Sequence, residues 1–474
     1  MNPPNFVFIL ADDLGYADLG CCCARSPCSP EIDRMAREGL RFTNGYANSS
    51  VCSPTRFALM TGRYQYRLRG GNDEPIATRS RGNPDLGLPP GEPTLPSVLR
   101  GAGYTTALVG KWHLGFPPHF GPLQSGYHEF FGVMAGGVDY FTHRDGPGVH
   151  DLCEGETQAH RTGYLTDLIS ERALEYIERR KGAKAPFLLS VHYTAPHWPW
   201  ETRDDAAESA RIGNSIVHTD GGSVETYLAM IRHMDEGIGR IIQALKGIGA
   251  DENTMVVFTS DNGGERFSDT WPLVGKKMDL LEGGIRVPYV VRWPARVEPG
   301  GLTRQHAMTM DWTATLFEAA SAKLPPGREP GAWRRCAHAT SSGRRPCRRW
   351  RRTPGSRFPT ARRTSRSRRS GALSDCPGWR QWPLPAARCS IRAGRRNIVA
   401  HAHPRHRRSS ARSRRAWHGA RRRGARARGG GCKWARGGAC PRRARAAPGA
   451  RAARSEPARL QRARRARALA PGAA

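Results

Sequence analysis

The chain has 474 residues, which is enough for one large domain or for two to three smaller ones. Its formal net charge of +34 is unevenly distributed, because residues 331–474 hold 42 of the 75 basic residues but 2 of the 41 acidic ones. Residues 1–330 therefore carry a net charge of −6 and the remainder carries +40. This distribution excludes a uniformly basic nucleic-acid-binding or membrane-surface protein, which the mean charge alone would suggest.

Twelve cysteines are divided equally between the two parts, and their spacing shows no disulfide framework. The cysteines at 21–23 and 28 are spaced almost as in a metal-binding cluster. However, no second pair of cysteines or histidines lies at the distance typical of a zinc finger, so we expect reduced thiols. The apolar run at 6–10 is too short for a signal peptide, and no run approaches the length of a membrane span. These features predict a cytoplasmic protein with no membrane partner, or an exported one if a signal precedes the given start.

Short apolar runs and amphipathic segments alternate along residues 1–330. Strands are predicted for the apolar runs at 6–10, 104–109, 187–191 and 255–259. Helices are predicted where apolar residues share one face or where cap residues bound a segment, at 29–39, 94–100, 165–177 and 224–245. This alternation predicts an α/β fold with a doubly wound, mostly parallel sheet flanked by helices.

Residues 331–474 have a different composition. They contain eight Ile, Leu, Val or Phe residues among 144, too few to bury the apolar area that would offset ordering entropy, so we predict a disordered, Arg-rich tail. One interpretation is a basic nucleic-acid-binding arm. The other is a frameshifted translation of a GC-rich gene, because the codons of Arg, Ala, Gly and Pro are GC-rich. All basic residues except Lys433 are arginine and no motif recurs, so we favour the frameshift, which disfavours a nucleic-acid partner.

Two polar pairs directly follow predicted strands. Asp12 and Asp13 come after the strand at 6–10, and Asp261 and Asn262 come after the strand at 255–259. Taken alone, each pair is a common turn or helix-cap sequence. However, the carboxyl ends of parallel strands meet at one edge of a sheet, where ligands bind. Three carboxylates and one amide oxygen at that edge would supply the oxygen ligands that Ca²⁺ or Mg²⁺ requires.

A Cys-Ser-Pro-Thr-Arg run at 52–56, followed by Thr-Gly-Arg at 61–63, resembles the signature of the sulfatase family. In that family an enzyme oxidises the cysteine to formylglycine, whose hydrated aldehyde is the nucleophile. The resemblance makes Cys52 the precursor of the nucleophile and assigns Arg56 to the site, although proline and arginine here also fit a loop with a surface salt bridge. It also implies a helix that begins at Cys52 and points its free N–H groups at an anion.

Three later motifs resemble the same family, at 110–115, 195–197 and 275–288. The site residues that they supply are Lys111, His113, His197 and Lys277. Lys276 is the near alternative in the last motif, and His192 is expected to lie inside its strand, hydrogen-bonded or packed. A single lysine or histidine is more often structural, but the motifs occur together and in the family's order across about residues 5 to 320.

The resemblance implies an alkaline-phosphatase-like fold for a sulfatase-like catalytic domain at 1–330. It implies a Ca²⁺ site, with Mg²⁺ as the alternative, whose ligands are Asp12, Asp13, Cys52, Asp261 and Asn262. In the mechanism of the family, the hydrated aldehyde attacks sulfur, and His197 or Lys277 protonates the leaving alcohol. His113 then takes the proton that lets the aldehyde re-form and expel sulfate.

The function that the resemblance implies is hydrolysis of sulfate esters, of the arylsulfatase kind. The expected partners are a small-molecule or saccharide sulfate ester and the enzyme that makes formylglycine. A phosphonate or phosphate ester hydrolase of the same superfamily is the first alternative, and nucleic-acid binding through the tail is an alternative of another class. Family members continue with a small C-terminal antiparallel subdomain, which nothing in 331–474 resembles.

Overall fold

The structure is a computed structural model that describes residues 2–217 and 221–326. The tail predicted at 331–474, with its two interpretations, lies outside the described residues. Among the helices in those two ranges, none combines the length and the hydrophobicity that crossing a membrane requires.

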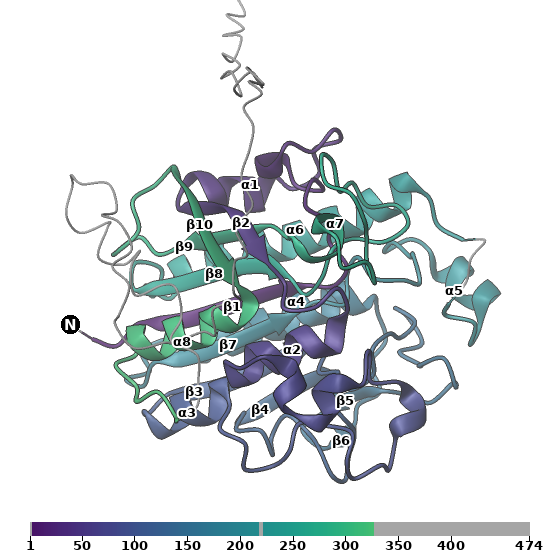
Figure 1. Ribbon diagram of the computed structural model, residues 1–474, viewed down its shortest axis with the longest axis horizontal. Helices are drawn as coiled ribbons and strands as arrows, with labels where there is room; N and C mark the ends of the chain where they lie inside the picture. The colour runs from purple at the N-terminus through teal and green to yellow at the C-terminus, as the bar shows by residue number, and fades with distance from the viewer. Residues whose placement is uncertain (1, 218–220, 327–474) are drawn as a thin grey trace, which may run out of the picture. The chain divides into compact units, whose positions relative to one another are not determined.

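A ten-stranded sheet crosses the molecule, and most of its strands run parallel (Figure 1). In spatial order the strands are β10 (Gly301–Met308), β2 (Leu40–Tyr46), β9 (Tyr289–Arg292), β8 (Thr254–Ser260), β1 (Asn5–Ala11), β7 (Phe187–His192), β3 (Thr105–Gly110), β4 (Glu129–Val133), β5 (Leu152–Glu154) and β6 (Thr157–Gln158). β9 is antiparallel to β2 and β8, and β5 is antiparallel to β4 and β6. The strands β8-β1-β7-β3-β4 between them are parallel, which confirms the predicted doubly wound sheet.

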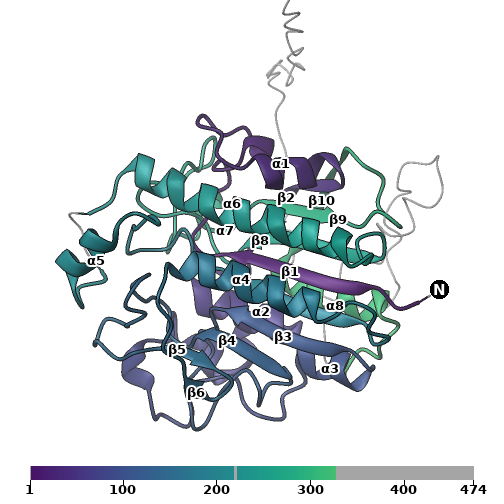
Figure 2. The ribbon, with the colours of Figure 1, turned by 180° about the vertical axis from the view of Figure 1, so that it is seen from behind.

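Helices cover both faces of this sheet. They are α1 (Pro30–Arg37), α2 (Cys52–Thr61), α3 (Leu95–Gly101), α4 (Leu165–Glu178), α5 (Ala206–Ile212), α6 (Val224–Gly247), α7 (Glu282–Ile285) and α8 (Thr309–Ala319). α2, α3 and α8 lie on the face toward the viewer in Figure 1, and α4 and α6 lie on the opposite face, which Figure 2 shows. α1 packs against α6 and β9.

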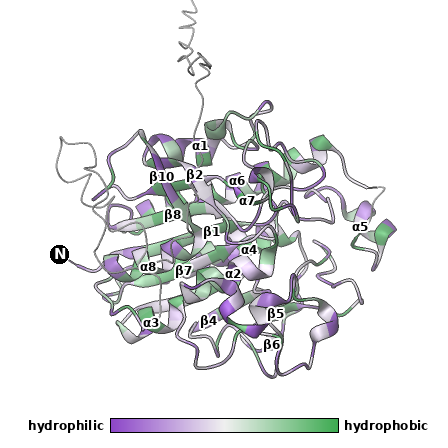
Figure 3. Cartoon of the chain, viewed as in Figure 1, coloured by the Kyte–Doolittle hydropathy of each residue, from purple (hydrophilic) through white to green (hydrophobic). Residues whose placement is uncertain are grey.

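The core lies between the central strands and these helices. Every residue of β8 is buried, as is all of β7, because both strands are covered on both faces. Phe8 of β1 contacts Trp312 of α8 edge to face, with ring centroids 6.5 Å apart. Figure 3 shows both hydrophobic and hydrophilic residues along α8, as expected of a helix with one side against a sheet.

The sequence predicts the central elements within a few residues. The strands expected at 6–10, 104–109, 187–191 and 255–259 correspond to β1, β3, β7 and β8. The expected helices correspond to α1, α3, α4 and α6, and the helix that the family resemblance implies at Cys52 is α2. The sequence patterns predict neither the strands β10, β2 and β9 at one edge of the sheet nor β4, β5 and β6 at the other, and they do not predict the helices α5, α7 and α8.

Candidate active site and metal site

Adjacent parallel strands end at the same edge of the sheet, and each is followed by polar residues. Leu10 of β1 pairs with His192 of β7 on one side and with Thr259 of β8 on the other, so the three strands end level. The site residues that follow β1, β3, β7 and β8 are Asp12, Asp13, Lys111, His113, His197, Asp261 and Asn262. The topology alone therefore gathers the polar groups that lie far apart in the sequence.

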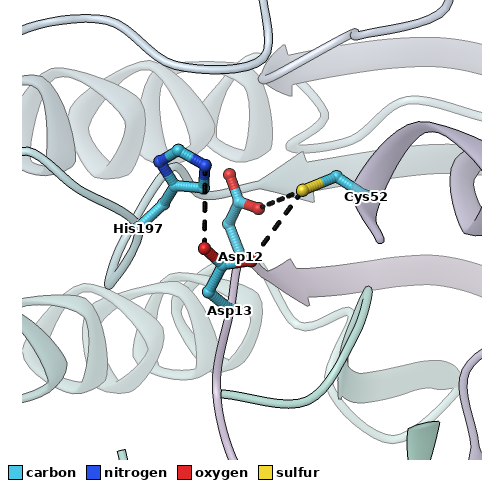
Figure 4. Close-up of side chains that lie close together, drawn as sticks. All are labelled: Asp12, Asp13, Cys52 and His197. Atoms are coloured by element: carbon cyan, nitrogen blue, oxygen red, sulfur yellow. Dashed lines mark hydrogen bonds and ion pairs between the residues drawn. The ribbon is translucent and has the colours of Figure 1, made fainter. Parts of the chain in front are cut away.

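Figure 4 shows four side chains of this edge that face one another, Asp12, Asp13, Cys52 and His197. Their ligand-type atoms all lie within 4.8 Å of one another, and all four residues are buried. Cys52 Sγ lies 3.3 Å from Asp12 Oδ1 and 3.8 Å from Asp13 Oδ1. His197 Nε2 lies 3.6 Å from Asp13 Oδ2. A cluster of oxygen, nitrogen and sulfur atoms of this size could surround one cation.

Asn262 adds an amide to the cluster. Its Nδ2 donates to Asp13 Oδ1 at 2.7 Å, and its Oδ1 is buried with no hydrogen-bond partner among the described residues. A buried carbonyl oxygen without a partner is costly, and a bound cation would satisfy it. Asp261 lies next to Asn262, and its Oδ1 accepts from the backbone N–H of Asp13 at 3.3 Å.

Three cationic side chains pair with the three carboxylates. Lys111 Nζ contacts Asp12 Oδ2 at 2.5 Å, and Lys277 Nζ contacts Asp13 Oδ2 at 2.7 Å. The Arg56 guanidinium binds Asp261 Oδ2 through Nη2 at 2.8 Å and Nε at 2.9 Å. When all three carboxylates are ionised these six charges cancel, so one divalent ion would then leave the site with two net positive charges.

The buried and charged environment shifts the pKa values of Asp12 and of the Cys52 thiol. Burial, together with the neighbouring charge of Asp261, raises the pKa of Asp12 to about 7. Burial and the charges of Asp12 and Asp261 also raise the pKa of the Cys52 thiol well above its ordinary value. Cys52 is the first residue of α2, and its Sγ contacts Asp12 and Asp13, so the N-terminus of this helix lies beside the cluster. The unmodified thiol here is a weak nucleophile.

His113 has one free ring nitrogen. Its Nε2 lies 2.8 Å from the carbonyl oxygen of Ile76 and therefore carries the proton, while Nδ1 is buried without a hydrogen-bond partner in the described parts of the chain. Burial and the nearby charge of Lys111 lower the pKa of His113 well below its ordinary value. His113 is thus neutral, with a lone pair on Nδ1 that can accept a proton.

His197 shows the opposite tautomer. Its Nδ1 donates to the carbonyl oxygen of Trp198 at 2.6 Å, so Nε2 carries the lone pair and faces Asp13. Burial and the charges of Lys277 and Lys111 lower the pKa of His197 well below its ordinary value. The Trp198 ring stands beside both groups, with the Lys277 ammonium 5.7 Å from its centroid.

The structure brings the predicted site residues to one sheet edge, and their roles stay predictions. It also separates the two pairs of neighbouring candidates that the sequence offered, Lys277 from Lys276 and His197 from His192. Lys277 reaches Asp13 and is 10% exposed at its side chain, whereas Lys276 is exposed. His192 ends β7 and is buried, with Nδ1 3.3 Å from the carbonyl oxygen of Lys111, as expected of a histidine packed in its strand.

The family model described as Sulfatase matches residues 4–322 of the chain. The chain belongs to the sulfatase family. Among the similar proteins is the mouse (Mus musculus) N-acetylgalactosamine-6-sulfatase, which is 33% identical over 347 residues covering 69% of this chain and 64% of the relative. Mouse arylsulfatase J is 34% identical over 333 residues covering 68% of this chain and 53% of that relative. The sulfatase match thus covers the described residues, and the chain spans about 64% of the first relative's length.

A solved structure shows the same sulfatase fold. The crystal structure of Ps i-CgsB in complex with k-i-k-neocarrahexaose is 30% identical, with a TM-score of 0.63, and the match covers 70% of this chain and 75% of that one. The ten-stranded, mostly parallel sheet described above is therefore the alkaline-phosphatase-like sulfatase fold. The motifs at 110–115 and 195–197 follow the central strands β3 and β7, the motif at 52–56 begins α2, and the motif at 275–288 lies in the segment after β8 that includes α7.

Proposed function

We propose that this chain hydrolyses sulfate esters with a nucleophile made from Cys52 and with the help of one divalent cation. The observation that carries the proposal is the position of Cys52. The sequence places it 40 residues from Asp12, yet its Sγ lies 3.3 Å from that carboxylate at the start of a buried helix. A formylglycine made at this position would stand beside the metal ligands and the cations.

The donor set fits a hard cation. Asp12, Asp13, Asp261 and Asn262 would hold it, because Asp12 and Asp13 belong to the cluster, Asp261 and Asn262 each hydrogen-bond to Asp13, and Asn262 Oδ1 lacks a partner within the described residues. Ca²⁺ is our proposed ion and Mg²⁺ the alternative, since both prefer oxygen ligands. When bound, the ion supplies positive charge that orients the sulfate and favours the ionised nucleophile.

The cationic residues bind the anionic group of the substrate. A sulfate ester carries its negative charge on oxygens that repel nucleophiles, and Lys111, Lys277 and Arg56 neutralise that charge. Arg56 pairs with Asp261 and donates to the Lys111 carbonyl oxygen, so it also holds the geometry of the site, and each lysine offers ammonium protons beyond its contact with a carboxylate. Removing one such group costs about 10²–10³ in rate, as for an oxyanion donor.

Lys277 and two histidines divide the proton transfers. Lys277, whose ammonium carries protons, can deliver one to the leaving alcohol, and His197, whose Nε2 carries a lone pair and faces the cluster, is the other candidate once that nitrogen has taken up a proton. His113 Nδ1 is the buried free base that can accept the proton released when sulfate departs. The two rings expose different nitrogens because each is fixed by a backbone carbonyl, at Trp198 and at Ile76.

A sulfated saccharide is our proposed substrate class. The mouse relative is named for N-acetylgalactosamine-6-sulfate, and the structural neighbour was solved with a neocarrahexaose. The second required partner is an enzyme that converts Cys52 to formylglycine. Release of sulfate from sulfated saccharides, compared with an aryl sulfate and a phosphate diester, tests the substrate class and its phosphate or phosphonate alternative.

The chemistry is tested by Cys52→Ser. The introduced hydroxyl can attack sulfur once, releasing the alcohol, but a single hydroxyl cannot re-form an aldehyde and expel sulfate. We expect mass spectrometry to find one sulfo group on the variant after incubation with a reactive aryl sulfate, with no further product. Repeated turnover by this variant, without bound sulfate, would rule out the mechanism. The unmodified wild-type thiol is expected to be inactive.

A further inference from the structure

Next to the turn that carries Asp12 and Asp13 lies a fourth buried carboxylate, Asp18, that the proposed chemistry does not use. Its side chain is 3% exposed and accepts four hydrogen bonds from three parts of the chain. The donors are the Tyr227 hydroxyl at 2.6 Å, the Ser268 hydroxyl at 2.7 Å, the Gly15 N–H at 2.7 Å and the Asp269 N–H at 2.6 Å. A buried carboxylate with this many donors is a rigid junction.

The junction connects the segments that carry the site. Gly15 belongs to the turn after β1 that begins with Asp12 and Asp13, and Ser268 belongs to the loop after β8 that leads to Lys277. The backbone joins the same two segments, because the Ala17 N–H donates to the carbonyl oxygen of Asp269 at 2.9 Å. Asp18 and Tyr227 therefore fix the turn of the metal ligands relative to the loop of the active-site lysine.

Tyr227 also contacts a metal ligand directly. Its hydroxyl, on α6, lies 3.2 Å from the backbone carbonyl oxygen of Asp13. Asp13 has φ of +67°, a conformation that residues other than glycine adopt only when their surroundings impose it. The Asp13 N–H donates to Asp261 Oδ1 at 3.3 Å, so side chains hold both of its peptide groups. Without the hydroxyl, one of these two restraints is lost.

We propose that Tyr227 and Asp18 are positioning residues for the metal ligand Asp13. The inference rests on the proposed metal-dependent function and adds to it residues that touch neither metal nor substrate. The one proton of the Tyr227 hydroxyl is shared between Asp18 Oδ2 at 2.6 Å and the Asp13 carbonyl oxygen at 3.2 Å, so the hydroxyl ties the strained turn to Asp18 and helps to present the Asp13 carboxylate to the cluster. Relaxation of Asp13 to a common backbone conformation would turn its carboxylate away from Asn262 and Lys277.

The test is binding of the metal alone. Tyr227→Phe removes one hydroxyl and keeps the buried ring, which is 1% exposed. Tyr176→Phe is the matched control, because Tyr176 is also 1% exposed and its hydroxyl makes one hydrogen bond, to Thr105 Oγ1 at the start of β3, the opposite end of that strand from Lys111. The full-length chain, freed of metal by a chelator, is titrated with CaCl₂ and MgCl₂ in a calorimeter, and urea denaturation is measured without metal.

Loss of an outer residue that orients a ligand typically weakens metal affinity 10–100-fold. We expect Tyr227→Phe to raise the dissociation constant for the ion by about 10-fold or more, while Tyr176→Phe leaves it unchanged at a similar urea midpoint. Asp18→Asn, if it folds, should weaken binding at least as much. Equal affinity of Tyr227→Phe and wild type would overturn the inference, as would equal weakening by Tyr176→Phe. A wild-type chain that binds neither ion would overturn the proposed function and the inference together.

Discussion

Arg56 provides a direct test of how the charges of the site are held. Its side chain is 1% exposed, with two nitrogens on Asp261 Oδ2 at 2.8 and 2.9 Å and Nη1 on the Lys111 carbonyl oxygen at 3.0 Å. Arg56→Met keeps most of the side-chain volume but leaves Asp261 as a buried charge without its partner. Breaking a buried pair in this way costs about 3–5 kcal/mol of unfolding free energy. Because methionine fills much of the space, the cavity contribution is small.

Arg203→Met is the matched control. Arg203 binds Asp167 at 2.7 and 2.8 Å and Glu236 at 3.1 Å, but its side chain is 41% exposed, so water compensates for the lost contacts. Exposed pairs of this kind contribute at most about 1 kcal/mol. Urea denaturation followed by tryptophan fluorescence measures both variants. If Arg56→Met loses no more stability than Arg203→Met, the buried pair is not the electrostatic anchor that the geometry indicates.

Two further variants test groups around the site. Burial and the charge of Asp139 raise the pKa of Glu201 to about 9, so the folded chain keeps a proton that the unfolded chain releases above about pH 4.5. Its contribution to stability is fully present below that pH and falls as pH rises toward 9. Glu201→Gln should therefore gain stability relative to wild type between pH 5 and pH 9 in urea denaturation, and an unchanged difference would contradict the assignment. Gly110→Ala places a methyl group against the carbonyl oxygen of His192 at φ +111°, and should cost about 1–3 kcal/mol and displace Lys111. Gly101→Ala, in α3 with open space around its Cβ position, should be neutral or stabilising in the same measurement.

The central fold follows from the sequence because its signal is local. β1, β7 and β8 are buried along almost their whole length, so each appears as a mostly apolar run. β2 and β10 are only partly buried, and polar residues such as Arg41, Asn44 and Gln305 interrupt their patterns. β9 has only four residues, Tyr289–Arg292. Their pairing with the sheet depends on partners up to 262 residues away in sequence, as for His306 and Asn44, which no local pattern records.

The residues of the candidate site could be predicted from the sequence because they occur in recognisable motifs, several of which follow predicted strands. The predicted residues converge, and Lys277 is separated from Lys276 by its contact with Asp13, 264 residues away. The sequence does not indicate which ring nitrogen of His113 or His197 is free. That choice depends on the carbonyl groups of Ile76 and Trp198, which the folded backbone brings to the rings.

Tyr227 marks the limit of what sequence patterns reveal. On α6 it occupies a buried position of an amphipathic helix, so its pattern is that of a core residue that packs against the sheet. Its hydroxyl partners, Asp13 and Asp18, precede it by 214 and 209 residues. A buried tyrosine hydroxyl usually has a hydrogen-bond partner, but the sequence does not indicate which residue that partner is. The Tyr227 hydroxyl connects a helix on one face of the sheet to the strained turn at Asp13, one of the proposed metal ligands, and this connection is visible only in the folded chain.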